Sequence, residues 1–350
     1  MAALSLRGLV KRFGEVTAVD RVDLEIENGE FLALLGPSGC GKTTVLRLIA
    51  GFEKPSAGEI AFDGAVVSGA GMHLPPERRR IGIVFQSYAL WPHMTVARNV
   101  GYPLEVAKVR GRDYDRRVAA ALKTVGLDGL AARRPAELSG GQRQRVALAR
   151  CLVMTPSVVL LDEPLANLDV HLRAAMEEEF RRLHAETGAT MVYITHDQAE
   201  AMALADRIAV LDGGRLVQAA TPERLYSEPA APMVAGFIGE GAVVDARVIA
   251  AAGDGRCAVR LYGREMRLRC GAGVRAGPAK VCIRPEDIGV VETGIPVAVR
   301  RRRYKGGYSA IDVAPAAAPD DRLLLRLPAA AALPGDGFEI EIADGWVMPG

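Results

Sequence analysis

The sequence predicts an α/β domain followed by a small all-β domain. An apolar run at residues 30–35 leads into a glycine-rich loop and then into a helix that ends near residue 50. Short, fully apolar runs at residues 81–84 and 158–161 are typical of buried parallel strands. Towards the C-terminus, short strand patterns are instead separated by glycine and proline turns. We therefore expect two domains, residues 1–235 and 236–350.

Composition limits where the protein works and what it binds. The formal net charge of +2 gives no reason to expect nucleic acid as a general partner. The five cysteines are scattered and form no C-x-x-C pair, which predicts free thiols in a reducing compartment. The N-terminus does not resemble a signal peptide, and no apolar run reaches the roughly 18 residues that span a bilayer. We expect a cytoplasmic protein that meets a membrane only through a partner.

The chain begins with an antiparallel pair of strands at residues 4–10 and 19–26. Phe13 lies on the turn between them. Its ring either fills an edge of the core or stacks on an adenine base. Both interpretations stay open on these residues alone.

The glycine-rich loop at residues 36–44 matches the pattern G-x-x-x-x-G-K-[ST]. Its glycines allow successive backbone N–H groups to turn towards a phosphate chain, and the helix that follows adds a partial positive charge. Lys42 is expected at the β- and γ-phosphates and Thr43 at Mg²⁺. The loop predicts that the chain binds a nucleoside triphosphate through Gly36, Ser38, Gly39, Cys40, Gly41, Lys42, Thr43 and Thr44. We also expect ATP to block alkylation of the Cys40 thiol.

Gln86 ends the next buried strand, where its amide can reach a metal ion or a water molecule. The connection that follows, residues 87–96, is unusually rich in large apolar and aromatic side chains. This connection is either part of the core or an exposed surface that docks a partner.

Two helices come next in the sequence. The first, at about residues 114–125, is amphipathic. The second begins after Ser139, a good N-cap, and continues through residue 152. The free amides of Gly140 and Gly141 at this helix start form a second anion site, although S-G-G read alone is only a cap and a loop.

Polar side chains follow two further strands. Asp162 and Glu163 end the apolar run at residues 158–161, at the sheet edge where α/β sites lie. Asp162 suits the Mg²⁺ shell, and Glu163 suits activation of a water in line with the γ-phosphate. His196 follows a strand at residues 190–194, from which its ring can reach a γ-phosphate or serve only the structure.

In order and spacing, these motifs resemble the full set of an ATP-binding cassette (ABC) ATPase. The set consists of Phe13, the loop at residues 36–44, Gln86, the segment Leu138, Ser139, Gly140, Gly141 and Gln142, the pair Asp162 and Glu163, then Asp169 and His196. The resemblance implies a RecA-like α/β core, an antiparallel β subdomain, and a helical subdomain at about residues 87–156. It also favours adenine stacking for Phe13.

Such proteins work as head-to-tail dimers. The resemblance implies that Ser139 to Gln142 of one copy close over the ATP held by Lys42 of the other. The chain agrees, because it has two phosphate-binding elements but one such lysine and one acidic pair. The implied roles are general base for Glu163, contacts to γ-phosphate and water for His196 and Gln86, and coupling between the two sites for Asp169.

The C-terminal quarter reads as a small β-barrel. Strand patterns are expected at residues 243–248, 257–261, 265–269, 280–284, 288–291, 297–299, 323–327 and 338–342. The R-P-E-D sequence from Arg284 to Asp287 resembles a segment of the oligonucleotide-binding-like (TOBE) accessory domain found on importer ATPases.

Arg300, Arg301, Arg302 and Arg303 form a basic run beside Tyr304. Such a run can hold nucleic acid or anionic lipid headgroups. A strand end solvated on both faces explains it as well, and we favour that interpretation because the rest of the chain is not basic.

The resemblance implies the ATP-hydrolysing subunit of a bacterial importer at the cytoplasmic face of the inner membrane. It would drive a separate integral membrane permease that an extracytoplasmic solute-binding protein supplies, and residues 87–96 would contact that permease. Polyamines, ferric iron and related ions are the favoured cargo, ahead of sugars. The alternatives are an exporter subunit, or a soluble ATPase that acts on nucleic acid or ribosomes.

Overall fold

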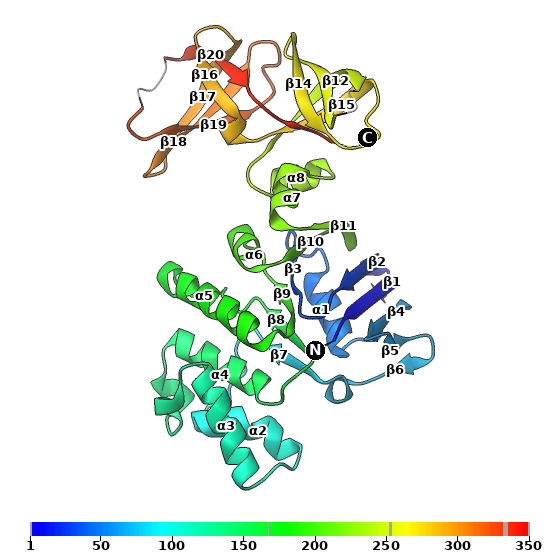
Figure 1. Cartoon of the computed structure of the whole chain (residues 1–350), viewed down its shortest axis with the longest axis vertical. Coiled ribbons are helices and arrows are strands. Elements are labelled where there is room, and N and C mark those ends of the chain that lie inside the picture. Colours follow the sequence, from blue (N-terminus) through cyan, green and yellow to red (C-terminus); the bar gives the residue numbers. More distant parts are fainter. Residues whose placement is uncertain (1, 167, 252–253, 332–334, 349–350) are drawn as a thin grey trace. The chain divides into compact units, whose positions relative to one another are not determined.

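The computed structural model describes residues 2–166, 168–251, 254–331 and 335–348 (Figure 1). By its internal contacts the chain divides into two compact units, Met1–Pro222 and Glu223–Gly350. The expected domain boundary at residue 235 lies within the second of these units. The first unit combines sheets and helices and the second is mainly strands, so the predicted α/β and all-β fold classes are confirmed.

A six-stranded sheet forms the centre of the first unit, in the order β11-β10-β3-β9-β8-β7. Neighbours from β10 to β7 are parallel, and only β11 is antiparallel. The central strands are buried along nearly their whole length, which explains their unbroken apolar runs. The strands are β3 (Phe31–Leu35), β7 (Ile81–Val84), β8 (Val158–Asp162), β9 (Thr190–Ile194), β10 (Arg207–Asp212) and β11 (Arg215–Ala220).

Three helices of the first unit begin within or just after the functional motifs. Helix α1 contacts β8 and β9, and α6 contacts β3. Helix α5 carries Met176, Phe180 and Leu183 fully buried on its inner face. The helices are α1 (Lys42–Ala50), α5 (Val170–Thr187) and α6 (Gln198–Leu204).

A five-stranded antiparallel sheet, in the order β2-β1-β4-β5-β6, packs into the same core as the parallel sheet. The expected antiparallel start is therefore confirmed. Its strands are β1 (Leu4–Phe13), β2 (Val16–Ile26), β4 (Ala57–Phe62), β5 (Ala65–Gly69) and β6 (Met72–His73).

A buried arginine joins this sheet to helix α1. Arg79 is 3% exposed and follows a short 3₁₀ turn, Pro76–Arg78. Its guanidinium donates to the carbonyls of Leu48 (2.7 Å) and Ile49 (2.9 Å) near the end of α1, and to that of Leu74 (2.7 Å), which follows β6. Burial lowers the pKa of Arg79 to about 10, so it still carries its charge at neutral pH. Arg79, the middle one of three successive arginines at residues 78–80, thus links α1 to the segment after β6 inside the fold.

Helices α2 (Val96–Val106), α3 (Arg112–Thr124) and α4 (Gly140–Leu152) occupy the region expected to be helical. Helix α2 was not predicted, because its sequence contains both Gly101 and Pro103. The Thr95 side chain caps it, and fully buried Asn99 holds both backbone polar groups of Trp91.

The second unit contains two sheets, although one barrel was expected. Strands β12-β13-β14-β21-β15 close into a barrel, and β16-β20-β17-β18-β19 form a separate five-stranded sheet. Strands β18 and β21 were not predicted. The strands are β12 (Ala242–Ala251), β13 (Arg256–Leu261), β14 (Arg264–Cys270), β15 (Gly277–Ile283), β16 (Ile288–Val291), β17 (Ile295–Tyr304), β18 (Tyr308–Pro315), β19 (Leu323–Pro328), β20 (Gly337–Ile342) and β21 (Trp346–Val347).

Arg284 of the R-P-E-D segment is buried and binds the two short helices of this unit. It is 4% exposed and donates to the carbonyls of Tyr226 (3.0 Å), Ala235 (3.1 Å) and Ile238. These carbonyls lie at or next to α7 (Pro222–Ser227) and α8 (Pro232–Phe237). The Tyr226 ring packs 4.1 Å from the guanidinium, and its hydroxyl donates to Glu286. The segment fastens the two helices to the barrel.

The basic run lies at the end of β17. Arg303 pairs with Asp312 on the neighbouring strand (2.8 Å), Arg302 donates to the Gly335 carbonyl (2.9 Å), and Arg300 donates to the Pro319 carbonyl (3.4 Å). These partners favour a solvated strand end over a free cationic surface.

Candidate functional site

The predicted motifs meet at one edge of the parallel sheet. Strands β3, β9, β8 and β7 run in the same direction, so their carboxyl ends lie together. Ile194 at the end of β9 is level with Leu34 on one side and with Asp162 on the other. This edge therefore gathers the residues that follow these strands: the loop at residues 36–44, Gln86, Asp162, Glu163 and His196.

The glycine-rich loop needs glycine at two of its positions. Gly36 has φ 154°, and a Cβ there would lie 2.2 Å from the Leu211 carbonyl oxygen. Gly41 has φ 106°, and a Cβ there would lie 2.5 Å from the Ala18 carbonyl oxygen. Any side chain at either position would collide with backbone, so the loop's path is incompatible with other residues.

Lys42 is folded into its own loop and is 6% exposed. Its Nζ donates to the carbonyls of Gly36 (2.7 Å) and Pro37 (3.0 Å). Ser38, Gly39 and Thr43 are exposed, whereas Thr44 is half-buried. The loop thus presents donors to solvent while its cation is held by backbone oxygens. Cys40 is 3% exposed, so its thiol is less accessible than our alkylation hypothesis assumes.

The acidic pair follows β8. Burial raises the pKa of Asp162, the negative charge of Glu163 raises it further, and Arg47 partly offsets both effects. Glu163 has φ 44°, and its backbone N–H donates to the Ile194 carbonyl (3.0 Å). Its Oε2 lies 3.3 Å from Nδ1 of the exposed His196. The structure thus brings Glu163 and His196 together.

These residues fit a magnesium ion bound jointly with a nucleotide. Among the described residues there is no cluster of three or more His, Cys, Asp or Glu that makes a protein-only metal site. Mg²⁺ at phosphate sites is commonly held by one or two carboxylates plus phosphate oxygens. The half-buried carboxylate of Asp162, whose ionised form is disfavoured by its surroundings, is suited to such a partner.

The S-G-G-Q segment begins helix α4. The Ser139 hydroxyl accepts from the Gln142 N–H (3.3 Å), and the Gln142 side chain accepts from the Ser139 N–H (2.9 Å). The predicted cap is confirmed. None of the described hydrogen bonds joins this segment to the glycine-rich loop. Asp169 is exposed and caps helix α5 through the Leu172 N–H (3.0 Å).

Two aromatic predictions have separate outcomes. The Phe13 ring is 47% exposed with Lys11 Nζ 4.7 Å from its centroid, so it does not fill the core. In the apolar connection, Tyr88 is buried, whereas Trp91 lines an open groove of about 330 Å³. The groove is lined by Ile81, Gly82, Ile83, Phe85, Ala89, Trp91, Pro103, Arg150, Cys151 and Met154. The connection therefore contributes Tyr88 to the core and Trp91 to an open groove.

Sequence reasoning missed a set of polar residues behind His196. A cavity of about 30 Å³ is lined by Glu163, Ala166, Arg173, Thr195, His196, Asp197 and Glu200. The only sequence signal is the D-x-x-E spacing of Asp197 and Glu200, which is typical of a helix cap. Asp197 does cap α6, but Glu200 is 3% exposed and makes other contacts.

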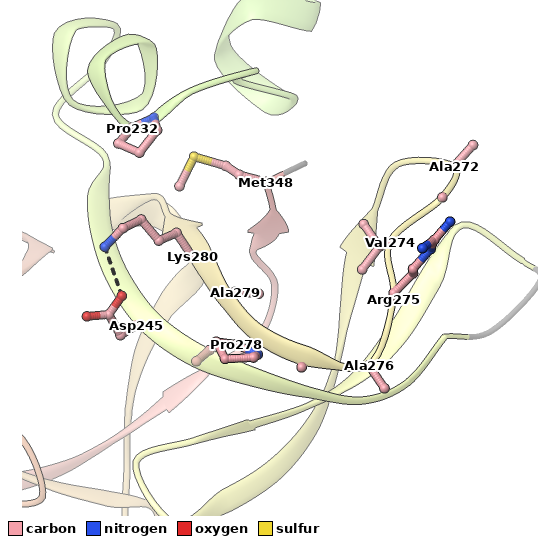
Figure 2. A pocket seen from close by; sticks show the side chains of 13 residues that line it. Pro232, Asp245, Ala272, Val274, Arg275, Ala276, Pro278, Ala279, Lys280 and Met348 are labelled. Atoms are coloured by element: carbon pink, nitrogen blue, oxygen red, sulfur yellow. Dashed lines mark hydrogen bonds and ion pairs between the residues drawn. The ribbon is translucent and has the colours of Figure 1, made fainter. Parts of the chain in front are cut away.

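A larger cavity, of about 810 Å³, lies in the second unit (Figure 2). Its walls are mainly small or apolar residues such as Ala276, Pro278 and Met348. Lys280 is paired there with Asp245 at 2.8 Å, as the dashed line in Figure 2 marks. No predicted site residue lines this cavity.

Comparison with known proteins agrees with the geometry. The ABC transporter family profile matches residues 19–166. The chain is 48% identical to a spermidine/putrescine import ATP-binding protein PotA of Pseudomonas aeruginosa, over 83% of this chain and 79% of that protein. It is 43% identical to the PotA of Methylococcus capsulatus, over 99% and 92%. It is 52% identical to the sn-glycerol-3-phosphate import ATP-binding protein UgpC 1 of Rhizobium johnstonii, over 69% and 65%, so the match spans just under two thirds of UgpC 1.

A solved structure matches as well. The dimeric ATP-binding cassette MJ0796, in a post-hydrolysis state bound to ADP and Pi, superposes with a TM-score of 0.55 at 34% identity, over 63% of this chain and 98% of that chain. The family profile, the long matches at high identity and the shared fold confirm the resemblance of the motifs. The chain belongs to the ABC transporter family, in its group of import ATP-binding proteins.

Proposed function

We propose that the protein hydrolyses ATP to drive a membrane permease that imports a small solute. The observation that carries the proposal is the contact between Glu163 and His196 at the sheet edge that also holds the Lys42 loop. A general base must lie within reach of the γ-phosphate water, and this edge supplies both the phosphate loop and the base.

The residues divide the chemistry among them. Lys42 leaves the carbonyls of its loop for the β- and γ-phosphates, and the N–H groups of residues 38–44 surround the phosphate chain. Thr43, Asp162 and Gln86 would hold Mg²⁺, which would neutralise charge on the phosphate oxygens. Glu163 accepts the proton of the attacking water, and His196 contacts the γ-phosphate beside it. Phe13 stacks on adenine with its exposed ring.

The working form we propose is a head-to-tail homodimer. The cap at Ser139 leaves Gly140 and Gly141 amides at the start of α4, and the second protomer would place them on the γ-phosphate. Asp169 at the start of α5 would couple the two sites. The dimeric state of the matching cassette MJ0796 supports this assembly.

The permease would dock at the Trp91 groove, so the protein would lie peripherally at the cytoplasmic face of the inner membrane. Phe52, with a ring centroid 6.3 Å from that of Phe85, and Met154 add exposed apolar surface around the groove. In the part of the chain that the structure describes, no helix is both long and apolar enough to cross a bilayer. In the proposed assembly, the permease supplies the membrane path.

The proposed cargo is a polyamine, ferric iron or a related small ion, brought by an extracytoplasmic solute-binding protein. The long matches to proteins named for spermidine and putrescine support polyamines. A sugar is the alternative, since a trehalose/maltose import ATP-binding protein of Thermococcus litoralis is 52% identical over 68% of this chain.

The proposal is tested by trapping the ATP-bound dimer. Glu163→Gln should bind Mg-ATP without turnover and remain dimeric, and it should co-purify an integral permease from native membranes. Glu178→Gln is the matched control, because Glu178 is an exposed glutamate on α5 away from the sheet edge. Recovery of ribosomes or DNA without a permease would overturn the importer function.

A further inference from the structure

We propose that Arg173 and Glu200 are positioning residues that fix the His196 loop against Glu163 and connect it to the turn before α5. The inference rests on the proposed ATPase function and extends it to two residues outside the recognised motifs. It begins with Glu200, whose carboxylate is buried beneath the loop.

Glu200 accepts two short hydrogen bonds on one oxygen. Its Oε2 receives the hydroxyls of Tyr193 (2.7 Å) and Thr195 (2.6 Å). Burial raises the pKa of Tyr193, and the charge of Glu200 raises it further, so the phenol stays protonated and remains a donor. Thr195 Oγ1 in turn accepts from the Asp197 N–H (3.0 Å). The residues on both sides of His196 are therefore held in place.

Arg173 joins this cluster to the start of α5. Its Nε lies 3.5 Å from Glu200 Oε1, and one terminal nitrogen donates to Asp197 Oδ2 at 3.1 Å. The other donates to the Leu168 carbonyl at 3.4 Å, next to Asp169. One planar guanidinium thus contacts the turn that contains Asp169, the Asp197 carboxylate next to His196, and the buried Glu200 carboxylate.

The position of the cluster is what gives it a role in the reaction. Arg173, Thr195 and Glu200 line the same small cavity as Glu163 and His196. His196 is 60% exposed at its side chain, so packing alone does not fix its ring. Its 3.3 Å contact to Glu163 is instead set by the backbone that Thr195 and Asp197 hold. A movement of Asp169 would reach His196 through Arg173.

The competing explanation is that Arg173 only links α5 to α6 and has no effect on His196. The chain offers a matched control for this explanation. Arg181 also lies on α5 and donates to the Ala203 carbonyl at the end of α6 (2.5 Å), away from the His196 loop. Arg181→Ala removes a link between the same two helices and leaves the cluster intact.

The test compares steady-state ATP hydrolysis of the purified full-length variants. Arg173→Ala should lower kcat by about 10-fold to 100-fold and change KM for ATP less than 2-fold, because positioning acts on the chemical step. Arg173→Lys should recover part of the lost kcat, since lysine keeps the positive charge but cannot make all three contacts of the guanidinium. Arg181→Ala should keep the wild-type kcat.

A second variant guards against misfolding of the first. Thr195→Val removes the hydroxyl at nearly constant volume and should lower kcat about 10-fold, whereas Thr195→Ser should not. Wild-type kcat in Arg173→Ala or in Thr195→Val would overturn the inference while leaving the ATPase function standing. Equal losses in Arg173→Ala and Arg181→Ala would also overturn it, in favour of a link between α5 and α6 alone. Absence of hydrolysis in the wild-type chain with Mg-ATP would overturn both proposals.

Discussion

Lys42 and Arg284 are both buried cations that donate to backbone carbonyls, one in each unit of the molecule. Lys42 is 6% exposed and binds two carbonyls of its own loop, whereas Arg284 is 4% exposed and binds carbonyls of three residues around α7 and α8. Locally, the two sites use the same chemistry. The two sites differ in whether a ligand can reach the cation and displace its carbonyl partners.

Around Lys42 the neighbouring Ser38 and Thr43 are exposed, so we expect a phosphate to be able to enter and replace the carbonyls as partner of the ammonium group. Around Arg284 the Tyr226 ring covers the guanidinium and the carbonyls belong to the chain segments that Arg284 holds. We therefore expect a buried cation to bind a ligand where its partners are replaceable and to serve only the fold where they are not. Burial alone does not distinguish a binding site from a structural contact.

The variant Lys42→Ala is the strongest test of the difference between Lys42 and Arg284. We expect ATP hydrolysis to fall by about 10³-fold or more, because the charge that meets the phosphates is lost. The free energy of unfolding should change by less than about 1 kcal/mol, since Pro37 is exposed and water can enter the space that the Lys42 side chain leaves beside the freed carbonyls. Phosphate release and denaturant titration measure the two effects. Lys54→Ala is the control, because Lys54 is exposed. A large loss of stability in Lys42→Ala would show that Lys42, like Arg284, serves the fold.

Arg284→Ala should show the opposite pattern. Its removal leaves buried carbonyls without donors, so we expect the second unit to lose about 3 kcal/mol of stability. Nucleotide binding by the first unit should persist. Urea unfolding followed by limited proteolysis separates the two units, with exposed Arg264→Ala as the matched control. A loss below about 1 kcal/mol would show that Arg284 does not serve the fold.

Asp162→Asn should raise the stability of the fold and abolish activity. The raised pKa means that ionised Asp162 stabilises the fold less than protonated Asp162 does. Its favourable contribution is complete below the unfolded value of 3.8 and is lost as pH rises through the folded pKa. At neutral pH we therefore expect Asp162→Asn to unfold about 2 °C higher than wild type while ATP hydrolysis is lost. A thermal midpoint that is unchanged or lower at pH 7 would contradict this.

The smallest expected effect concerns the thiols. All five cysteines are buried, and burial raises the pKa of Cys151 to about 12. We expect every thiol to react with iodoacetamide at least about 10-fold more slowly in the folded chain than in urea. Alkylation of Cys40 should be slower still in the presence of Mg-ATP, as peptide mapping of the alkylated sites would show. Equal Cys40 labelling rates with and without Mg-ATP would rule out its protection by nucleotide.

Short-range patterns predicted the parallel sheet and the positions of its polar strand ends. The run at residues 158–161 had to be a buried strand, and Asp162 and Glu163 then had to lie at its carboxyl end. Helix α2 escaped prediction because Gly101 and Pro103 lower its propensity, and packing of the fully buried Asn99 compensates only in the folded chain. The second C-terminal sheet escaped because strand pairing, such as β16 with β20, joins segments far apart in sequence.

The contacts of Glu200, Arg284 and Arg79 escaped prediction for a related reason. Each is a charged residue in a polar stretch, where a surface position is the ordinary expectation. Only the folded chain brings hydroxyls to Glu200 and carbonyls to the two arginines. Sequence motifs therefore indicated the residues that we propose to contact a ligand, but not the residues that hold them in place.

Helix α1 is secured at both ends, with Lys42 in the loop at its start and Arg79 on the carbonyls of Leu48 and Ile49 at its finish. The same guanidinium also binds the Leu74 carbonyl, just beyond β6 of the antiparallel sheet. We therefore expect a displacement of the glycine-rich loop that moves α1 to be transmitted through Arg79 to the antiparallel sheet.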